Sequence, residues 1–384
     1  MRCQMKTMKE IIQSYGTSMV SLCFIIGVPL CYMLIPDQVN SIEENRTLQQ
    51  MPKLHIADIL QKQYQDDMSS YLNDQFPKRF ALHKQKVSLE HALGNNEFSS
   101  VLIGKNDMLF QDIPAIEDTK IKQLSDTINS FVKQYHKINM HMLIAVNKAE
   151  IYPENLPAHI TLPSQKKTLS SFYKTLNKKI KITDIEDHFL DQKKENLYYR
   201  SDHHWTTKGA YEAFQVYLKN DLKAKNTLHY EPYVIHQTFQ GALANTSGYY
   251  SKKDDQVEIY VPDKNDPDVL VEYVNEKEKA ASVYVESKAS SSNPYEVFFG
   301  GNHALIQMTT SSETDKRLLV IKDSYANAFL PFLTPYYHEI TVIDPRYYMD
   351  DVNELMKNRN ITDVLFLYNF NTFFTDSSLV NLLQ

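Results

Sequence analysis

Residues 317–333 read RLLVIKDSYANAFLPFL, a short apolar run followed by a polar turn and a second apolar segment. The run 317–321 is typical of a buried strand, and the residues after it predict a turn and a helix. Two further strands are predicted at 339–343 and 362–368, with a loop and helix over 344–360 between them. This alternation predicts an α/β fold with a mainly parallel sheet, in which ligands bind at the carboxyl ends of strands.

Earlier parts of the chain alternate in the same way. Helices are predicted at 115–137, 164–179 and 206–224, and short buried strands at 141–146 and 181–185. The apolar spacing in each helix leaves one face to pack on the sheet.

The chain divides into three predicted regions. Residues 1–36 form a cytoplasmic tail and membrane anchor, residues 37–100 a polar helical lead-in, and residues 101–384 the α/β domain. Residues 228–310 are rich in Tyr, Val and Thr, and we expect them to form a β-rich insertion in that domain.

The amino terminus has the pattern of a membrane anchor. Residues 11–36 contain no charged side chain, residues 18–35 are the most apolar, and Arg2, Lys6 and Lys9 precede them. The positive-inside rule then predicts a single-pass cell-membrane protein with a cytoplasmic amino terminus and an extracellular body. A cleaved signal peptide is the alternative, but no small-x-small cleavage site ends the stretch.

Composition excludes some classes of function. The formal net charge is -6, and no basic cluster follows the first ten residues, which argues against nucleic-acid binding. The cysteines Cys3, Cys23 and Cys31 all belong to the amino-terminal segment, so the body has neither disulfides nor thiolate chemistry. A cysteine-free body is compatible with a bacterial surface protein.

Ser324 lies just after a predicted buried strand, at the start of the helix predicted next. That position would aim its hydroxyl into a crevice and place free N–H groups beside a developing oxyanion. Serine and aspartate are also common helix N-caps, so a purely structural role is the alternative.

A base for such a serine is available in RSDHHWTTKGAYEAF, residues 200–214. Asp202 would orient the ring of His204, which would remove the serine proton, while His203 would point elsewhere. Two alternatives stay open: a metal site made of Asp202, His203 and His204, or the solvated start of a helix. Asn369 ends the last predicted strand, where its amide would donate to an oxyanion or simply form a turn.

Several of these stretches carry a family resemblance. SDHHWT is the motif for which the DHHW proteins are named, and the chain resembles the alginate acetylation proteins of the J and X type. Through them it is similar to the SGNH hydrolases. Weaker matches are ENRTL, QFPKR, VLIGKNDMLF, IYPENLP, FFGGNH and VIKDSYANAFLPFL.

This resemblance implies a circularly permuted, three-layer SGNH-like fold in which Asp202 and His204 precede Ser324 and Asn369. It implies that Asp202 orients, His204 is the base, Ser324 is the nucleophile and Asn369 assists the oxyanion. The chain departs from the hydrolases in its Asp-x-His spacing and in Lys322, which replaces the glycine before the Asp-Ser pair.

Three more residues are candidates for substrate contact. Asn147 and Lys148 follow another predicted strand, and Arg346 lies in the segment DPRYY, where it would bind an anionic sugar. Structural roles are the alternative for each.

The resemblance implies an extracytoplasmic O-acetyltransferase that modifies a cell-surface or secreted polysaccharide through an acetyl-serine intermediate. It implies a membrane-bound O-acyltransferase as the partner that delivers acetyl groups. We expect neither a metal nor a cofactor. A carbohydrate esterase with the same triad, or a non-catalytic glycan-binding or assembly factor, are the alternatives.

Overall fold

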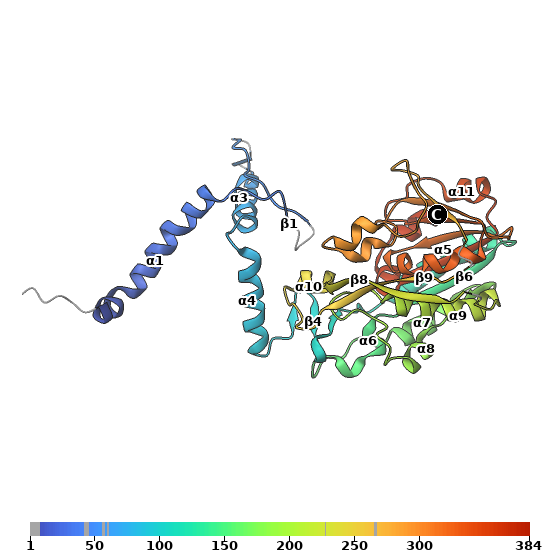
Figure 1. The fold of residues 1–384 in the computed structure, drawn as a ribbon, viewed down its shortest axis with the longest axis horizontal. Coiled ribbons are helices and arrows are strands. Elements are labelled where there is room, and N and C mark those ends of the chain that lie inside the picture. Colours follow the sequence, from blue (N-terminus) through green and yellow to red (C-terminus); the bar gives the residue numbers. More distant parts are fainter. Residues whose placement is uncertain (1–7, 42–45, 56–57, 60, 227, 265–266) are drawn as a thin grey trace, which may run out of the picture. The chain divides into compact units, whose positions relative to one another are not determined.

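The computed structural model describes residues 8–384 apart from 42–45, 56–57, 60, 227 and 265–266. The basic residues Arg2 and Lys6, and Cys3, lie outside this part of the chain. Two compact units are present, Met1–Leu93 and Gly94–Gln384. Figure 1 shows the elements of each unit.

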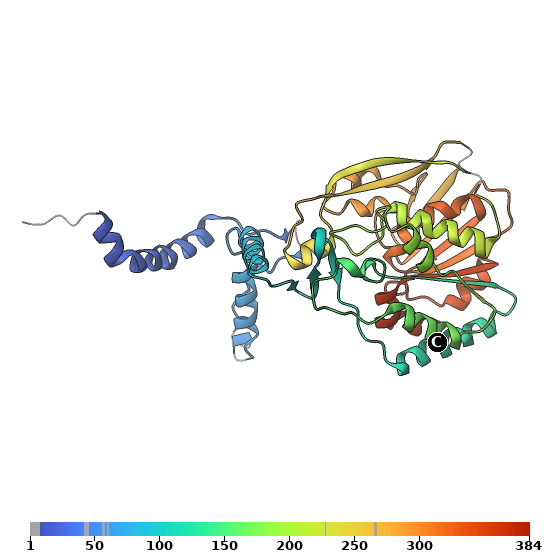
Figure 2. The same ribbon diagram turned by 90° about the horizontal axis from the view of Figure 1, so that it is seen from below.

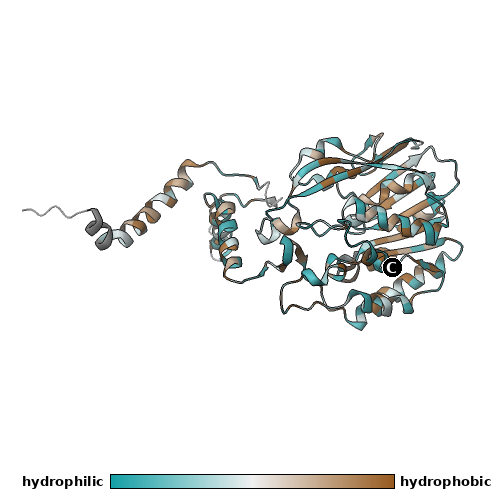
Figure 3. Cartoon of the chain, turned by 60° about the horizontal axis from the view of Figure 1, so that its bottom comes forward, coloured by the Kyte–Doolittle hydropathy of each residue, from teal (hydrophilic) through white to brown (hydrophobic). Residues whose placement is uncertain are grey.

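The first unit begins with the long helix α1, Met8–Leu34. Its segment Tyr15–Leu34 is long and apolar enough to cross a membrane, and a signal sequence would have the same properties. Apolar residues follow one another along much of this segment (Figure 3). The other described elements of the unit are α3 Gln63–Asp74, α4 Arg79–Ala92, β1 Asn40–Ser41 and β2 Arg46–Thr47.

The second unit is built on an eight-stranded sheet with the order β11-β10-β12-β14-β13-β15-β6-β7. Strands β14, β13, β15, β6 and β7 are mutually parallel, whereas β12, β10 and β11 extend the sheet antiparallel. The strands are β6 Asn139–Ala145, β7 Ile180–Ile182, β10 Val269–Tyr273, β11 Glu278–Ala280, β12 Leu305–Thr310, β13 Arg317–Lys322, β14 Glu339–Ile343 and β15 Asp363–Asn369. The mixed α/β fold with a parallel-containing sheet, expected from the sequence, is therefore confirmed.

Helices cover this sheet in two groups. One group contains α5 Asp118–Gln134, α7 Gln165–Thr175, α12 Phe370–Thr375 and α13 Ser378–Leu383, whose members contact one another. The other contains α8 Glu186–Asp191 and α9 Thr207–Tyr217. Figure 2 shows α9 and the pair α5 and α7 on opposite sides of the sheet. Buried apolar side chains from both groups complete a core around β13 and β15.

The parallel strands have an informative order. We number the strands β13, β14, β15, β6 and β7 from 1 to 5. Across the sheet they then have the order 2-1-3-4-5, which is a doubly wound order. In that arrangement the crevice for a ligand opens between strands 1 and 3, which here are β13 and β15. Ser324 follows the first of these strands and Asn369 ends the second.

Residues 228–310 contribute strands to two different sheets. β8 Tyr230–Phe239 and β9 Asp255–Pro262 pair as an antiparallel ribbon. The later strands β10, β11 and β12 belong to the main sheet itself. Two smaller elements of this unit are the antiparallel strands β4 Val101–Ile103 and β5 Leu109–Gln111.

The segment after Ser324 differs from the α-helix predicted there. It forms two 3₁₀ turns, Ser324–Ala328 and Leu330–Tyr336. Pro331 and Pro335 lack the N–H groups that an α-helix would need, which accounts for the difference.

A buried histidine joins three elements of the core. The His141 side chain on β6 is 1% exposed, and its Nδ1 and Nε2 lie 3.5 Å from Asp221 Oδ1 and 3.6 Å from Asp363 Oδ1. Burial alone would lower the pKa of His141, but the two aspartates outweigh it and raise the pKa above its ordinary value. The His141 ring therefore links Asp221 to the strand pair β6 and β15.

This cluster predicts a pH-dependent stability. A histidine whose folded pKa is raised stabilises the fold fully below its unfolded pKa of about 6.5, and this is lost as the pH rises through the folded pKa. We expect His141→Gln to lower the free energy of unfolding by about 3–5 kcal/mol at acidic pH, because two buried carboxylates lose their cation. Urea unfolding below and above neutral pH measures both effects. An equal loss at every pH would contradict the proposed linkage.

Candidate active site

Ser324 is the first residue of the 3₁₀ turn that follows β13, and Asp323 fixes this turn. One oxygen of the Asp323 carboxylate accepts the Tyr325 N–H at 2.9 Å, and the other accepts the Asn369 N–H at 2.9 Å. Burial raises the pKa of Asp323. The carboxyl ends of β13 and β15 are thus joined directly behind the serine.

The structure brings Asp202, His204 and Ser324 into one hydrogen-bonded row. His204 Nδ1 lies 2.6 Å from Asp202 Oδ1, and His204 Nε2 lies 2.8 Å from Ser324 Oγ, although 120 positions separate the last two along the chain. Asp202 and His204 are buried, whereas Ser324 is half-buried. A carboxylate, imidazole and hydroxyl in this order have the geometry of an activated nucleophile.

Backbone N–H groups hold the Asp202 carboxylate. Oδ1 also accepts the His204 N–H at 2.9 Å, and Oδ2 accepts the Ala242 N–H at 2.6 Å. Gly241 allows this approach, because a Cβ there would lie 2.3 Å from the Asp202 Cβ. Burial alone would raise the pKa of Asp202, but the histidines His203 and His204 and these hydrogen bonds hold it well below its ordinary value. The carboxylate is therefore ionised.

The metal alternative draws on the same residues. Ligand atoms of Asp202, His203 and His204 lie within 4.8 Å of one another. Both ring nitrogens of His204 are already engaged by Asp202 and Ser324, which leaves that ring no lone pair for a cation. The arrangement therefore suits proton transfer better than metal binding.

The sequence predicted that His203 points away from the site, but this prediction is wrong. Its ring lies against the His204 ring, with the centroids 3.9 Å apart and the planes at 35°. The backbone bends at residues 201–204 instead of extending, so neighbouring side chains do not alternate between faces. Burial, chiefly, lowers the pKa of His203 to about 3, so the ring is neutral at physiological pH.

Three aromatic residues hold the loop 201–204, the histidine loop, against the turn that begins at Ser324. Trp205 is fully buried, and its indole N–H donates to the Tyr325 carbonyl at 2.9 Å, while the Tyr325 hydroxyl donates to the His203 carbonyl. Tyr295 stacks on the His204 ring at 4.1 Å and donates its hydroxyl to the Ser324 carbonyl at 3.2 Å. Sequence reasoning did not find Tyr295, since nothing near it in the chain marks a site.

Lys148, predicted to contact substrate, lies underneath the histidine loop. Its side chain is buried, and Nζ donates to the carbonyls of Tyr199, Arg200 and Asp202 at 2.7, 2.9 and 2.6 Å. Burial lowers the pKa of Lys148 to about 7. All three ammonium protons are used, so the lysine is placed to shape the loop that carries Asp202 and His204.

We expect Lys148→Met to lower kcat by about 10²-fold, since three buried carbonyls lose their donor and the Asp202–His204 pair shifts. Hydrolysis of p-nitrophenyl acetate measures this, and circular dichroism checks that the variant is folded. The matched control is Lys122→Met on the exposed face of α5, where Lys122 pairs with Asp126. Unchanged turnover in a folded Lys148→Met protein would contradict this role.

The two candidate amides meet each other. The Asn369 side-chain amide donates to Asn147 Oδ1, and Asn369 Oδ1 accepts the Asn371 N–H at 3.0 Å as the N-cap of α12. Asn147 Nδ2 in turn donates to Asn371 Oδ1 at 2.9 Å. The structure thus brings Asn369 to Asn147 and to Asp323 rather than into a hydrogen bond with Ser324.

Arg346, the last candidate for substrate contact, is held by Asp344. Its Nε and Nη2 donate to both Asp344 oxygens at 2.8 and 2.6 Å, and its side chain is 28% exposed. Burial alone would lower the pKa of Arg346, but Asp344 raises it. The guanidinium also contributes to the lowered pKa of His203, the residue next to His204. A bidentate pair leaves further N–H groups of an arginine free for an anion.

Lys322, which stands where the hydrolases have glycine, is fully buried. Its Nζ donates to Asn302 at 2.8 Å and Asn327 at 2.9 Å and lies 3.6 Å from Asp344. Burial lowers the pKa of Lys322 to about 8. This lysine joins the end of β13 to the Gly300–Asn302 loop, which gives the FFGGNH motif a structural role.

Three solved structures are similar to this chain. The structure matches a DHHW family protein from Eubacterium siraeum at a TM-score of 0.65 and 21% identity, covering 74% of this chain and 95% of that one. It matches Bacillus cereus PatB1 with a sulfonyl adduct at 0.61 and 20%, covering 72% and 96%. The O-acetyltransferase domain of Pseudomonas putida AlgJ matches at 0.45 and 13%, covering 74% and 98%.

No curated protein sequence matches the chain. The family model described as DHHW protein matches residues 126–343, which is more than half of the 384 residues and includes the whole row from Asp202 to Ser324. The chain therefore belongs to the DHHW protein family.

Proposed function

We propose that this protein is an extracytoplasmic O-acetyltransferase that modifies a cell-surface or secreted polysaccharide through an acetyl-serine intermediate. The observation that carries the proposal is His204, which bridges the ionised Asp202 carboxylate and the Ser324 hydroxyl. The motif resemblance to alginate acetylation proteins supports acetyl transfer. PatB1 supports a reactive nucleophile, since that relative carries a sulfonyl adduct.

The first half-reaction acetylates the serine. His204 Nε2 takes the proton from Ser324 Oγ as the oxygen bonds to the acyl carbon of the donor. The protonated ring then gives that proton to the leaving group, whose bond to the acyl carbon breaks. The Asp202 carboxylate stabilises the imidazolium between these steps.

The second half-reaction passes the acetyl group to the sugar. A sugar hydroxyl loses its proton to His204 and attacks the acyl carbon, and the bond from that carbon to Ser324 Oγ breaks. Ser324 Oγ then recovers the proton. The backbone N–H of Ser324, at the start of its turn, is a donor for the oxyanion, and we assign Asn369 as a second donor once its amide leaves Asn147. Arg346 is placed to bind an anionic group of the acceptor.

The fold and location belong to the same proposal. The strand order is 2-1-3-4-5 when the late strands β13, β14 and β15 are numbered before the early strands β6 and β7. This order supports a circularly permuted, three-layer SGNH-like domain. We infer that α1 anchors this domain outside the cell membrane, beside a membrane-bound O-acyltransferase that supplies the acetyl group. Neither a cofactor nor a metal takes part in the steps above.

Trapping the acyl-serine tests the proposal. We expect p-nitrophenyl acetate to add one acetyl group, and phenylmethanesulfonyl fluoride one sulfonyl group, to a peptide containing Ser324. Alkali-deacetylated surface polysaccharide of the producing organism should then accept the acetyl group. Acetate release that this acceptor does not change would favour an esterase, and an unmodified protein would favour a non-catalytic glycan-binding role.

A further inference from the structure

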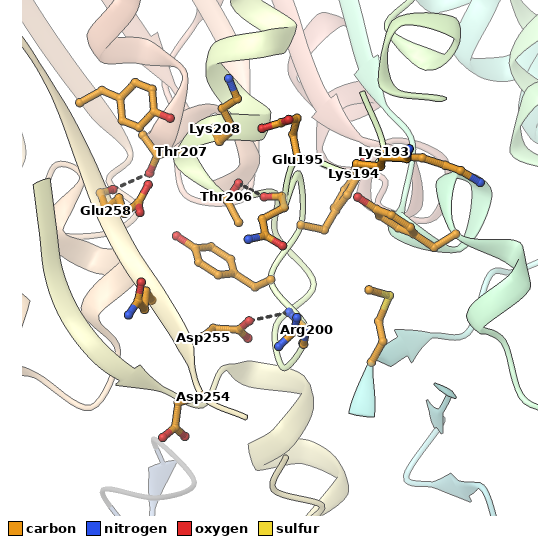
Figure 4. Close-up of a pocket in the computed structure, with 17 residues that line it drawn as sticks. Lys193, Lys194, Glu195, Arg200, Thr206, Thr207, Lys208, Asp254, Asp255 and Glu258 are labelled. Atoms are coloured by element: carbon orange, nitrogen blue, oxygen red, sulfur yellow. Dashed lines mark hydrogen bonds between the residues drawn. The ribbon is translucent and has the colours of Figure 1, made fainter. Parts of the chain in front are cut away.

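A polar cavity lies beside residues 198–200, which begin the loop that carries Asp202, His203 and His204. It has a volume of about 530 Å³, within the usual range for small-molecule sites. Its walls come from residues 193–200, the start of α9 and one face of β9 (Figure 4). Asp202, His204 and Ser324 do not line it, so it is separate from the row of reacting atoms.

The cavity nevertheless adjoins the base of the catalytic loop. Tyr198 pairs with Trp205 as an antiparallel bridge, so residues 198–205 form a hairpin-like loop with the histidines between its ends. Arg200 and Thr206, near these ends, line the cavity. Asp255 lines it too, and its carboxylate accepts the Arg200 N–H at 3.0 Å and the Ser201 N–H at 2.8 Å. An occupant would therefore contact the loop that presents His204.

One wall of the cavity is acidic. Alternate residues of β9 share a face of the strand, and Gln256, Glu258 and Tyr260 accordingly all line the cavity. Asp254 and Asp255 lie at the same edge (Figure 4). This wall presents carboxylate and amide oxygens, which accept hydrogen bonds.

The other walls carry four basic side chains and one acidic side chain, that of Glu195. Lys193, Lys194, Arg200 and Lys208 line them (Figure 4). Lys193 and Lys208 are paired with Glu154 at 3.1 Å and Glu212 at 2.9 Å, neither of which lines the cavity. This pairing argues against a strongly anionic ligand such as a phosphate, while Lys194 and Arg200 argue against a purely cationic one.

Donors on one side and acceptors on the other suit hydroxyl groups, because each hydroxyl both donates and accepts. Tyrosines add flat apolar faces: Tyr152, Tyr198, Tyr199 and Tyr260 all contribute to the lining. An uncharged, hydroxyl-rich ligand with apolar C–H faces meets all of these features at once, and a short saccharide has that chemistry.

We propose that this cavity is an accessory saccharide site, which holds part of the polysaccharide chain away from the hydroxyl that is acetylated. The inference rests on the proposed function for its substrate, but the binding it predicts does not depend on catalysis. Occupation would retain the acceptor between successive transfers and would favour long acceptors over short ones.

Filling the cavity tests this site. Gln256 is exposed on the lining face of β9, and we expect Gln256→Trp to block entry without touching the triad. The matched control is Lys253→Trp, also exposed but outside the lining. Full-length protein in detergent is applied to a printed bacterial-glycan array, in the wild-type form and as Ser324→Ala, Gln256→Trp and Lys253→Trp.

We expect the wild type, Ser324→Ala and Lys253→Trp to bind the same glycans, and Gln256→Trp to bind them with a Kd raised by about tenfold or more. All but Ser324→Ala should hydrolyse p-nitrophenyl acetate equally, which shows that the triad is intact. Absence of glycan binding by Ser324→Ala, or unchanged binding by Gln256→Trp, would overturn the site. Loss of the proposed function appears separately, as acetyl transfer that survives in Ser324→Ala.

Discussion

Ser324→Ala is expected to lower kcat for acetyl transfer by about 10⁴-fold or more, with no acetyl-protein formed. The variant lacks the oxygen that lies 2.8 Å from His204 Nε2, so the reaction cannot be divided into two half-reactions. Residual turnover would come from binding and oxyanion donors alone. Transfer from p-nitrophenyl acetate to the deacetylated polysaccharide, followed by acetate release under alkali, measures the loss.

A matched serine separates this effect from lost stability. Ser312 also donates one side-chain hydrogen bond, to the Thr334 carbonyl at 2.8 Å, and Ser312→Ala should keep wild-type kcat. Each alanine should cost about 1 kcal/mol of unfolding free energy, the net value of one hydrogen bond. Wild-type turnover by a folded Ser324→Ala protein would refute the acetyl-serine intermediate.

The central strands could be predicted because each is buried on both faces. Such a strand is a nearly continuous apolar run, and the runs predicted at 317–321, 339–343 and 362–368 coincide closely with β13, β14 and β15. Strand order is a different matter. The pairing of β15 with β6 joins segments more than two hundred residues apart, and no local pattern specifies it.

The candidate site also has residues that could be predicted from the sequence and residues that could not. Asp202, His204 and Ser324 could be proposed together because a carboxylate, an imidazole and a hydroxyl are the groups of an activated nucleophile. Ser324 also lies just after a predicted strand. The groups that hold them could not be proposed. Tyr295 reaches the His204 ring from a short turn, and Lys148 acts on backbone carbonyls, which are the same whatever the residue. Gly241 matters only because a distant carboxylate packs against it.

The second large effect is expected for Asp202→Asn, which should lower kcat by about 10⁴-fold while the fold persists. Asp202 accepts N–H groups on both oxygens, from His204 on one and from Ala242 on the other. An asparagine can offer an oxygen to only one of these sides. If its oxygen faces Ala242, its NH₂ group faces His204 Nδ1, which must then accept a hydrogen bond instead of donating one.

That exchange reverses the tautomer of His204. The proton moves to Nε2 and points at Ser324 Oγ, so the ring can no longer remove the serine proton. ¹⁵N chemical shifts of the imidazole report the tautomer directly, and the p-nitrophenyl acetate assay reports kcat. Asp126→Asn, at an exposed carboxylate paired with Lys122, is the control for the same chemical change. An Asp202→Asn protein with the reversed tautomer and undiminished kcat would show that His204 is not the base. Slow turnover with the original tautomer would instead assign the loss to the missing negative charge.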